Sequence, residues 1–153
     1  MPRGAAAART DGVDLQAQFA SMCNAFAHHG GMVHADEVVR SMRGSVEQPI
    51  SMLAKRIVSR EVVAIAWQHT LLVPMFQLNE NSMNPKPACR DIVAELTDAM
   101  DDWTIALWFA TCNPLLGGVA PVDMLSPCWN KALQAARAAR QVRAPHGGYS
   151  LRR

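Results

Sequence analysis

Residues 49–78 read PISMLAKRIVSREVVAIAWQHTLLVPMFQL, and the hydrophobic period changes inside this stretch. A proline suited to a first helical turn is followed by apolar residues at helical spacing: Ile50, Leu53, Ala54, Ile57 and Val58. The β-branched and aromatic segment VVAIAWQ comes next, and after a turn at His-Thr the segment LLVPMFQL returns. The pattern predicts a helix followed by a β-hairpin, in which Pro74 makes the second strand an edge strand or a bulged one.

Two shorter helical patterns precede this stretch. LQAQFASMCNAFAHH has apolar residues at helical spacing and stops at Gly30-Gly31, and ADEVVRSMR stops at Gly44. Residues 1–12 have little to bury, so we expect a disordered lead there. Residues 13–78 are then predicted to form a helix–hairpin module with the element order of a winged helix-turn-helix.

In such a module the second helix of the pair would lie in a major groove of DNA. Five polar residues near it are candidates for contacts to phosphates or base edges: Ser51, Lys55, Arg56, Ser59 and Arg60. The alternative is an ordinary solvated helix face, because the module as a whole is not strongly basic.

A second, helical unit is predicted over residues 89–143, after a polar, proline-containing connection. It comprises the helices RDIVAELTDAM and WTIALWFAT, the loop NPLLGGVAPVDML with a short helix, and an Ala- and Arg-rich helix over 129–142. Asp102 is the expected N-cap of the middle helix. The unit has four large aromatic residues that are either interface anchors or core side chains: Trp103, Trp108, Phe109 and Trp129. The expected fold is mainly α with a small β-hairpin.

The formal net charge of the 153 residues is +2, but the charge is distributed unevenly. Residues 1–130 carry nine basic and thirteen acidic residues, whereas the six basic residues from Lys131 onward have no acidic neighbour in the sequence. Residues 144–153 are expected to be a flexible basic tail. This asymmetry points to an anionic partner for the C-terminal end.

The same sequence argues against several classes of protein. With 50% apolar residues the chain is not expected to be disordered, and no apolar run approaches the roughly 20 residues that span a bilayer. No nucleotide-binding, hydrolase or metalloprotease motif is present, so we expect no enzyme and no cofactor. The spacing of Cys23, His28, His29 and His34 matches no structural zinc pattern, so we expect no metal site. Four scattered cysteines and no export signal predict a cytoplasmic protein with reduced thiols.

One segment carries a family likeness. AELTDAMDDWTIALWFATCNPLLGGVAPVDML resembles the toxin-binding domain of Xre/MbcA/ParS-type antitoxins, through an aromatic pair in a helix, Asn-Pro-Leu-Leu-Gly-Gly, and Pro-Val-Asp-Met-Leu. The upstream stretch, with Pro74, Phe76 and Gln77, is similar to the segment that some members place before that domain. Cys112 stands where members usually have proline.

The resemblance implies an antitoxin that binds and neutralises a RES-domain toxin, which depletes NAD, and that represses its own operon. Carried over by position, the toxin-facing candidates are Trp108, Asn113, Leu116, Gly117, Gly118, Pro121, Asp123 and Leu125. Arg152 and Arg153 follow a Gly-Gly hinge, and a cationic end of this kind suits a pocket built for the NAD pyrophosphate. The alternative for this tail is a solvated segment.

Two functions therefore stand as predictions. The first is an antitoxin-like subunit, expected to be a homodimer, with a RES-domain toxin as its partner and operator DNA as a second one. The alternative is a DNA-binding transcriptional regulator without a toxin partner.

Overall fold

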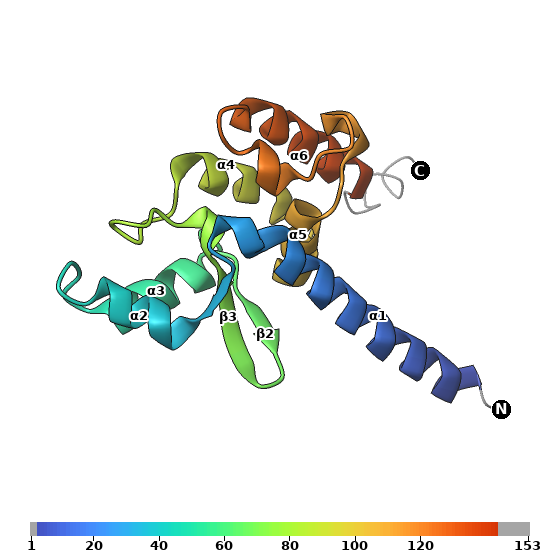
Figure 1. Ribbon diagram of the computed structural model, residues 1–153, viewed down its shortest axis with the longest axis horizontal. Coiled ribbons are helices and arrows are strands. Elements are labelled where there is room, and N and C mark those ends of the chain that lie inside the picture. The colour runs from blue at the N-terminus through green and yellow to red at the C-terminus, as the bar shows by residue number, and fades with distance from the viewer. Residues whose placement is uncertain (1–2, 144–153) are drawn as a thin grey trace, which may run out of the picture.

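The computed structural model describes the backbone of residues 3–143 and the side chains of residues 14–142. The described chain is mainly helical, with six helices and a small three-stranded antiparallel sheet (Figure 1), as the sequence predicted at this level. The elements are α1 Arg3–Phe26, η1 Ala27–His29, β1 Met32–His34, α2 Ala35–Met42, α3 Pro49–Val58, β2 Ile65–Trp67, β3 Thr70–Pro74, η2 Met75–Gln77, α4 Pro87–Leu96, α5 Asp102–Ala110, η3 Pro114–Leu116, η4 Pro121–Met124 and α6 Trp129–Arg143, where η marks a 3₁₀ helix.

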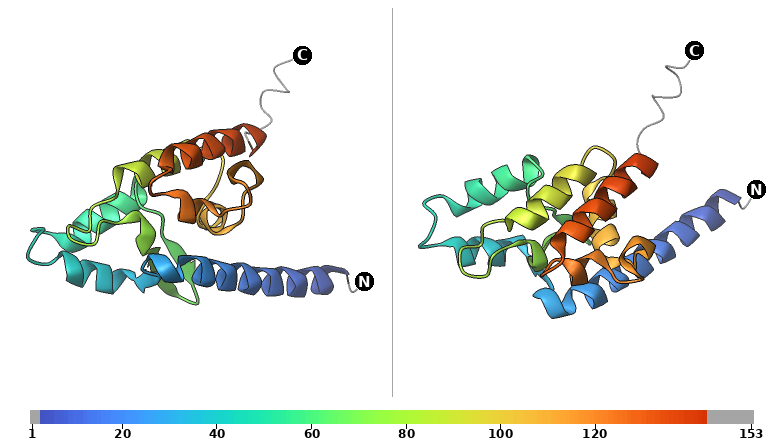
Figure 2. Two further views of the ribbon diagram at one scale, coloured as in Figure 1. Left: turned by 45° about the horizontal axis from the view of Figure 1, so that its top comes forward. Right: turned by 90° about the horizontal axis from the view of Figure 1, so that it is seen from above.

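Helix α1 begins earlier than the sequence pattern predicted. Its first residue is Arg3, inside the stretch expected to be a disordered lead. Alanine has the highest helix propensity, and an Ala-rich segment can continue a helix without burying a face. The N-terminal part of α1 extends away from the other elements (Figures 1 and 2), whereas Met22 and Phe26 near its C-terminal end are fully buried.

The chain turns sharply after η1. Gly30 has a φ of 91°, and a Cβ atom at this position would lie 2.9 Å from Cβ of Met75. Glycine is therefore required both by the left-handed backbone and by the close approach of η2. The turn brings the chain directly into β1.

The sheet contains one strand that the sequence pattern did not predict. The predicted hairpin is present as β2 and β3, but its turn lies at Gln68 and His69, one residue before the predicted His-Thr turn. Both residues have positive φ, as a two-residue hairpin turn requires. Strand β1 adds to β3 on its other side, with Met32 opposite Pro74. Strand β3 is therefore the central strand, and the expectation that Pro74 makes it an edge strand is wrong. Pro74 is tolerated because it is the last residue of the strand.

Successive residues before and within β2 point into two hydrophobic clusters. Val63 and Ile65 belong to a cluster formed with the C-terminal end of α1 and with α4, α5 and α6. Val62 and Ala64 belong to a second cluster, formed with α2 and α3. The period of two is that of extended backbone. The sheet thus lies between the α2–α3 pair and the remaining helices (Figure 2).

The side chain of Gln77 completes the backbone hydrogen bonds next to the sheet. Gln77 is 1% exposed, and its amide nitrogen donates to the carbonyl oxygens of Val63, at 2.8 Å, and Pro74, at 2.9 Å. Its amide oxygen accepts from the N–H of Val63 at 2.9 Å. A buried amide with both ends paired replaces two strand hydrogen bonds, so residue 63 needs no further strand partner.

In the C-terminal part, α4 packs along α6, and α5 packs against α1. The N-cap of α5 is Asp101, whose Oδ1 accepts from the N–H of Thr104 at 2.8 Å. The predicted cap, Asp102, is instead the first residue of the helix. Between residues 3 and 143 no helix combines the length and the apolar character that crossing a membrane requires.

Candidate functional site: a braced loop and an adjoining crevice

The loop from Asn113 to Val119 is held in shape by its own hydrogen bonds. The N–H of Asn113 donates to the carbonyl of Val119 at 3.1 Å, and the N–H of Gly118 donates to the carbonyl of Asn113 at 2.9 Å. The side-chain oxygen of Asn113 accepts from the N–H of Leu115, also at 2.9 Å. Gly117 and Gly118 have φ values of 68° and 86°, which strongly favour glycine. The Asn and the two Gly of the motif therefore shape the loop.

The loop buries one leucine and exposes the other. Leu116 is buried beneath the loop, as is Pro121 after it, so these two predicted toxin-facing residues hold the loop in place. Leu115 is 66% exposed and Val119 is 38% exposed. Neither residue was predicted from the sequence to be a contact. The adjacent Leu-Leu pair was the available signal, since neighbouring side chains on such a turn cannot both point inward.

The aromatic residues of this region divide between the core and the surface. Phe109 is fully buried, and Trp108 is half-buried against it in an edge-to-face contact with ring centroids 5.1 Å apart. Trp103 is half-buried and stacks on Trp67, and its Nε1 donates to Gln18 at 2.6 Å. Trp129 at the start of α6 is exposed. Trp129 is the most exposed of these four residues, at 39%, and so has the most surface left for an interface contact.

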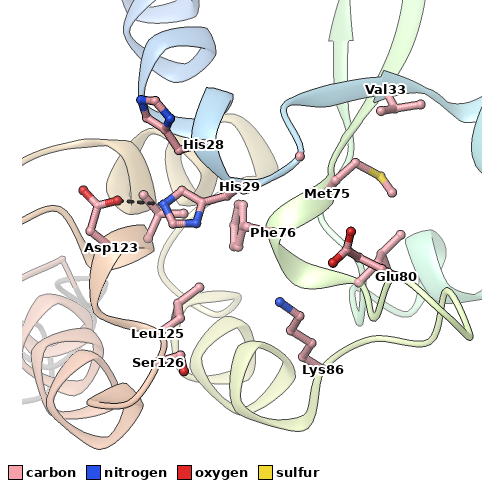
Figure 3. A pocket seen from close by; sticks show the side chains of 13 residues that line it. His28, His29, Val33, Met75, Phe76, Glu80, Lys86, Asp123, Leu125 and Ser126 are labelled. Atoms are coloured by element: carbon pink, nitrogen blue, oxygen red, sulfur yellow. Dashed lines mark hydrogen bonds and ion pairs between the residues drawn. The ribbon is translucent and has the colours of Figure 1, made fainter.

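A crevice of about 510 Å³ lies between η1, η2 and η4 (Figure 3). Two predicted toxin-facing residues, Asp123 and Leu125, line it, and Phe76 contributes to its apolar wall. Nε2 of His29 lies 2.7 Å from Oδ1 of Asp123, which ties η1 to η4. Lys86 enters from the opposite side (Figure 3). The crevice therefore combines an apolar wall with charged groups at its rim and is open to a protruding side chain of a partner.

The predicted toxin-facing residues thus form two neighbouring groups. Asn113, Gly117 and Gly118 lie in the braced loop, and Asp123 and Leu125 lie at the crevice. Arg152 and Arg153 lie outside the described residues.

The predicted DNA-facing residues do not form one free basic surface. Ser51, Lys55 and Ser59 are exposed on α3 or at its end. Arg56 instead donates to the carbonyl of Met83 at 3.2 Å and to the side-chain oxygen of Asn84 at 2.8 Å.

Arg60 is also engaged inside the molecule. Its guanidinium donates to the carbonyls of Thr97 and Met100, each at 2.7 Å, and approaches Oδ1 of Asp102 to 3.1 Å. It thereby caps the C-terminal end of α4 and pairs with the first residue of α5. Lys55 is left as the one cation of the predicted set that has no intramolecular partner among residues 14–142.

Two arginines of α6 face acidic residues at and just after the end of α4. Arg137 and Arg140 both approach Glu95, at 3.4 and 3.3 Å, and Arg140 also approaches Asp98 at 3.3 Å. These side chains are thus paired in the structure instead of lying free for phosphate contacts. Part of the uneven charge along the sequence is neutralised where the two helices pack.

Two titratable groups have shifted pKa values that follow from their surroundings, and the described residues hold no cluster of metal-ligating side chains. Residues 14–142 contain no group of three or more His, Cys, Asp or Glu side chains placed to hold a metal ion. Burial raises the pKa of Cys89 to about 11, against a smaller lowering by Lys86, so this thiol stays protonated at neutral pH. The hydrogen bonds from Thr104 lower the pKa of Asp101, which fits a structural cap.

Comparison of the chain with protein-family models, with curated proteins and with solved structures gave no match.

Proposed function

We propose that this chain is an antitoxin-like subunit that binds and neutralises a NAD-depleting RES-domain toxin in the cytoplasm. The braced loop carries this proposal, because it presents Leu115 and Val119 to solvent on a backbone fixed by Asn113, Gly117 and Gly118. Apolar side chains on a rigid loop lose little conformational entropy when a partner covers them. The sequence resemblance over the same loop supplies the identity of the partner.

The crevice beside the loop supports the same proposal. Leu125 and Phe76 offer an apolar wall to an inserted side chain, and the rim carries the Asp123 carboxylate and the Lys86 ammonium group. A partner would then contact the loop through apolar surface and the crevice rim through hydrogen bonds, which is the usual anatomy of a specific interface.

Co-purification tests the proposal. The tagged full chain is co-expressed with a RES-domain protein encoded in an adjacent open reading frame, and the double variant Leu115→Asp/Val119→Asp is compared with it. We expect the double variant to retain at most about a tenth of the partner, because two carboxylates would be buried without counter-ions.

Val142→Asp is the matched control, since Val142 is 81% exposed on α6, away from the loop. It should retain the partner as the unmodified chain does, and circular dichroism should be the same for all three proteins. Equal recovery of the partner with the double variant would contradict the assignment of the loop.

A second candidate function is DNA-binding regulation. It is supported by the order α2, turn, α3 and hairpin, and by the exposure of Ser51, Lys55 and Ser59 on α3 or at its end. The engagement of Arg56 and Arg60 leaves few cations for phosphate contacts. Binding to a fragment of the chain's own promoter would therefore show a shallow salt dependence, which Lys55→Ala would reduce further, by about one unit of slope. Absence of promoter binding even at low salt would exclude this function.

A further inference from the structure

One exposed side of α3, next to the side that carries Ser51 and Lys55, is apolar. Ile50 is 68% exposed and Val58 is 81% exposed, and with the exposed Ala54 between them they follow one another at four-residue intervals. Residues four apart lie on one side of a helix, so these three form a continuous stripe. A helix that reads DNA would present polar and cationic side chains on this face. The stripe instead has the composition of a protein contact.

A groove of about 330 Å³ runs beside the stripe, between α2 and α3. Val39, Leu53 and Ile57 contribute apolar side chains to it, and Leu71 of β3, which is 41% exposed, extends it. The groove is therefore open on the same side as the stripe. Exposed apolar surface gathered in one place marks an interaction site more often than isolated exposed residues do.

The two ends of the groove carry opposite charges. Helices α2 and α3 lie side by side and are joined by the loop of residues 43–48 (Figure 1), so α2 runs back along α3. Asp36 therefore lies at the end of the groove near Ile57, whereas Arg40 and Arg43 lie toward the end near Ile50. Within the described residues none of these three charged side chains takes part in an ion pair.

We propose that a second copy of this chain docks on the α2–α3 face, with the two α3 helices antiparallel and a two-fold axis near Ala54. A two-fold rotation places the acidic end of each groove against the basic end of the other, so Asp36 of one copy meets Arg40 and Arg43 of its partner. It also places Ile50 of each α3 next to Val58 of the other. The small side chain of Ala54 at the axis allows the helices to approach to about 8–10 Å.

Self-association accounts for these features better than another partner does, because a groove with one acidic and one basic end is complementary to its own rotated copy. A nucleic acid would be repelled by the acidic end, and a uniformly charged peptide by one end or the other. The contact involves two short helices per copy, so we expect a dissociation constant on the order of micromolar. The α2–α3 face lies at the other end of the molecule from α6 and the segment between α5 and α6 (Figure 1), which leaves both loops of a dimer free.

Sedimentation velocity of the full chain over a concentration series tests this inference without any toxin, so its result is separate from that of the proposed function. We expect a monomer–dimer equilibrium that Ala54→Arg weakens at least about tenfold, since it places two arginines at the axis. The matched control is Ala94→Arg, at an exposed position of α4, which should leave the equilibrium unchanged.

Reversing the charges at the two ends of the groove provides a second test of the dimer. Asp36→Arg alone should weaken the dimer, and adding Arg40→Asp and Arg43→Asp should restore it, because both ends of the groove are then reversed together. A chain that stays monomeric up to about millimolar concentration would overturn the inference. A dimer that Ala54→Arg leaves intact would also overturn it. So would a chain that sediments as a monomer and binds its promoter, if Ala54→Arg abolishes that binding.

Discussion

Arg60 joins three segments of the chain through one guanidinium group. Its backbone has a φ of 62°, which ends the turn after α3, and its side chain reaches the carbonyls at the end of α4 and the carboxylate of Asp102. The other oxygen of Asp102 accepts from the N–H of Ala64 at 3.2 Å. At the level of sequence Arg60 is one of several polar residues beside a helix, and its partners are about 40 residues away. Such long-range pairing could not be predicted without the fold.

Replacing Arg60 therefore tests the structural role against the DNA-binding role. Arg60→Met should lower the free energy of unfolding by about 2–3 kcal/mol, because it leaves helix-end carbonyls and a half-buried carboxylate without their charged donor. Lys55→Met, at an exposed position without partners, should change it by less than about 0.5 kcal/mol. Urea denaturation measures both variants, and equal stability of the two would contradict the role given to Arg60.

At the scale of elements, the helical segments were largely predictable and the contacts between them were not. The periodic patterns predicted α2, α3, α4 and α6, since each has an apolar stripe and a proline or glycine near an end. Strand β1 has only three residues and no alternating pattern, and it exists because the turn at Gly30-Gly31 lays it beside β3. A strand formed by a tertiary contact leaves little trace in local sequence.

At the candidate site, too, the local structure could be predicted from the sequence and the packing contacts could not. The motif Asn113-Pro-Leu-Leu-Gly-Gly marks the loop, because Asn and Gly are required by its hydrogen bonds and its positive φ values. The sequence does not say which leucine faces inward, since that depends on how η3 packs against α6. Leu116 was therefore proposed as a contact, and the structure places Leu115 at the surface instead.

The cap of α5 predicts a pH dependence. Asp101→Ala should lower the free energy of unfolding at pH 7 by about 1 kcal/mol, the usual effect of losing an N-cap. Because hydrogen bonding from Thr104 lowers the pKa of Asp101 in the folded state, its stabilisation is present above the unfolded pKa of about 4 and is lost as the pH falls through the folded pKa. Urea denaturation from pH 7 to pH 3 should show the two proteins converging in acid. A difference that stays constant with pH would contradict the cap.

At the scale of the whole molecule, the uneven charge along the sequence has a structural explanation in part. Arg137 and Arg140 of α6 lie against Glu95 of α4 and, for Arg140, against Asp98 just after it, so these two residues add less free positive charge than the composition suggests. Arg152 and Arg153 follow α6 in the sequence, and only the antitoxin proposal gives them a role, which is contact with the toxin.

Truncation separates binding from inhibition. A chain that ends at Ala144 keeps all the described elements, so we expect it to co-purify with the RES-domain toxin as the full chain does. It should fail to inhibit the toxin if Arg152 and Arg153 occupy the site for the NAD pyrophosphate. The NAD-consuming activity of the purified complexes gives the result, and full inhibition by the truncated chain would exclude this role for the tail.

The central proposal is that this chain binds and neutralises a NAD-depleting toxin. The most direct measurement is the NAD content of cells that express the RES-domain protein alone, with the full chain, or with the Leu115→Asp/Val119→Asp variant. We expect the full chain to restore NAD to the level of cells without toxin, and the variant, expressed to the same level, to leave it depleted. Continued depletion of NAD in the presence of the full chain would contradict the proposal.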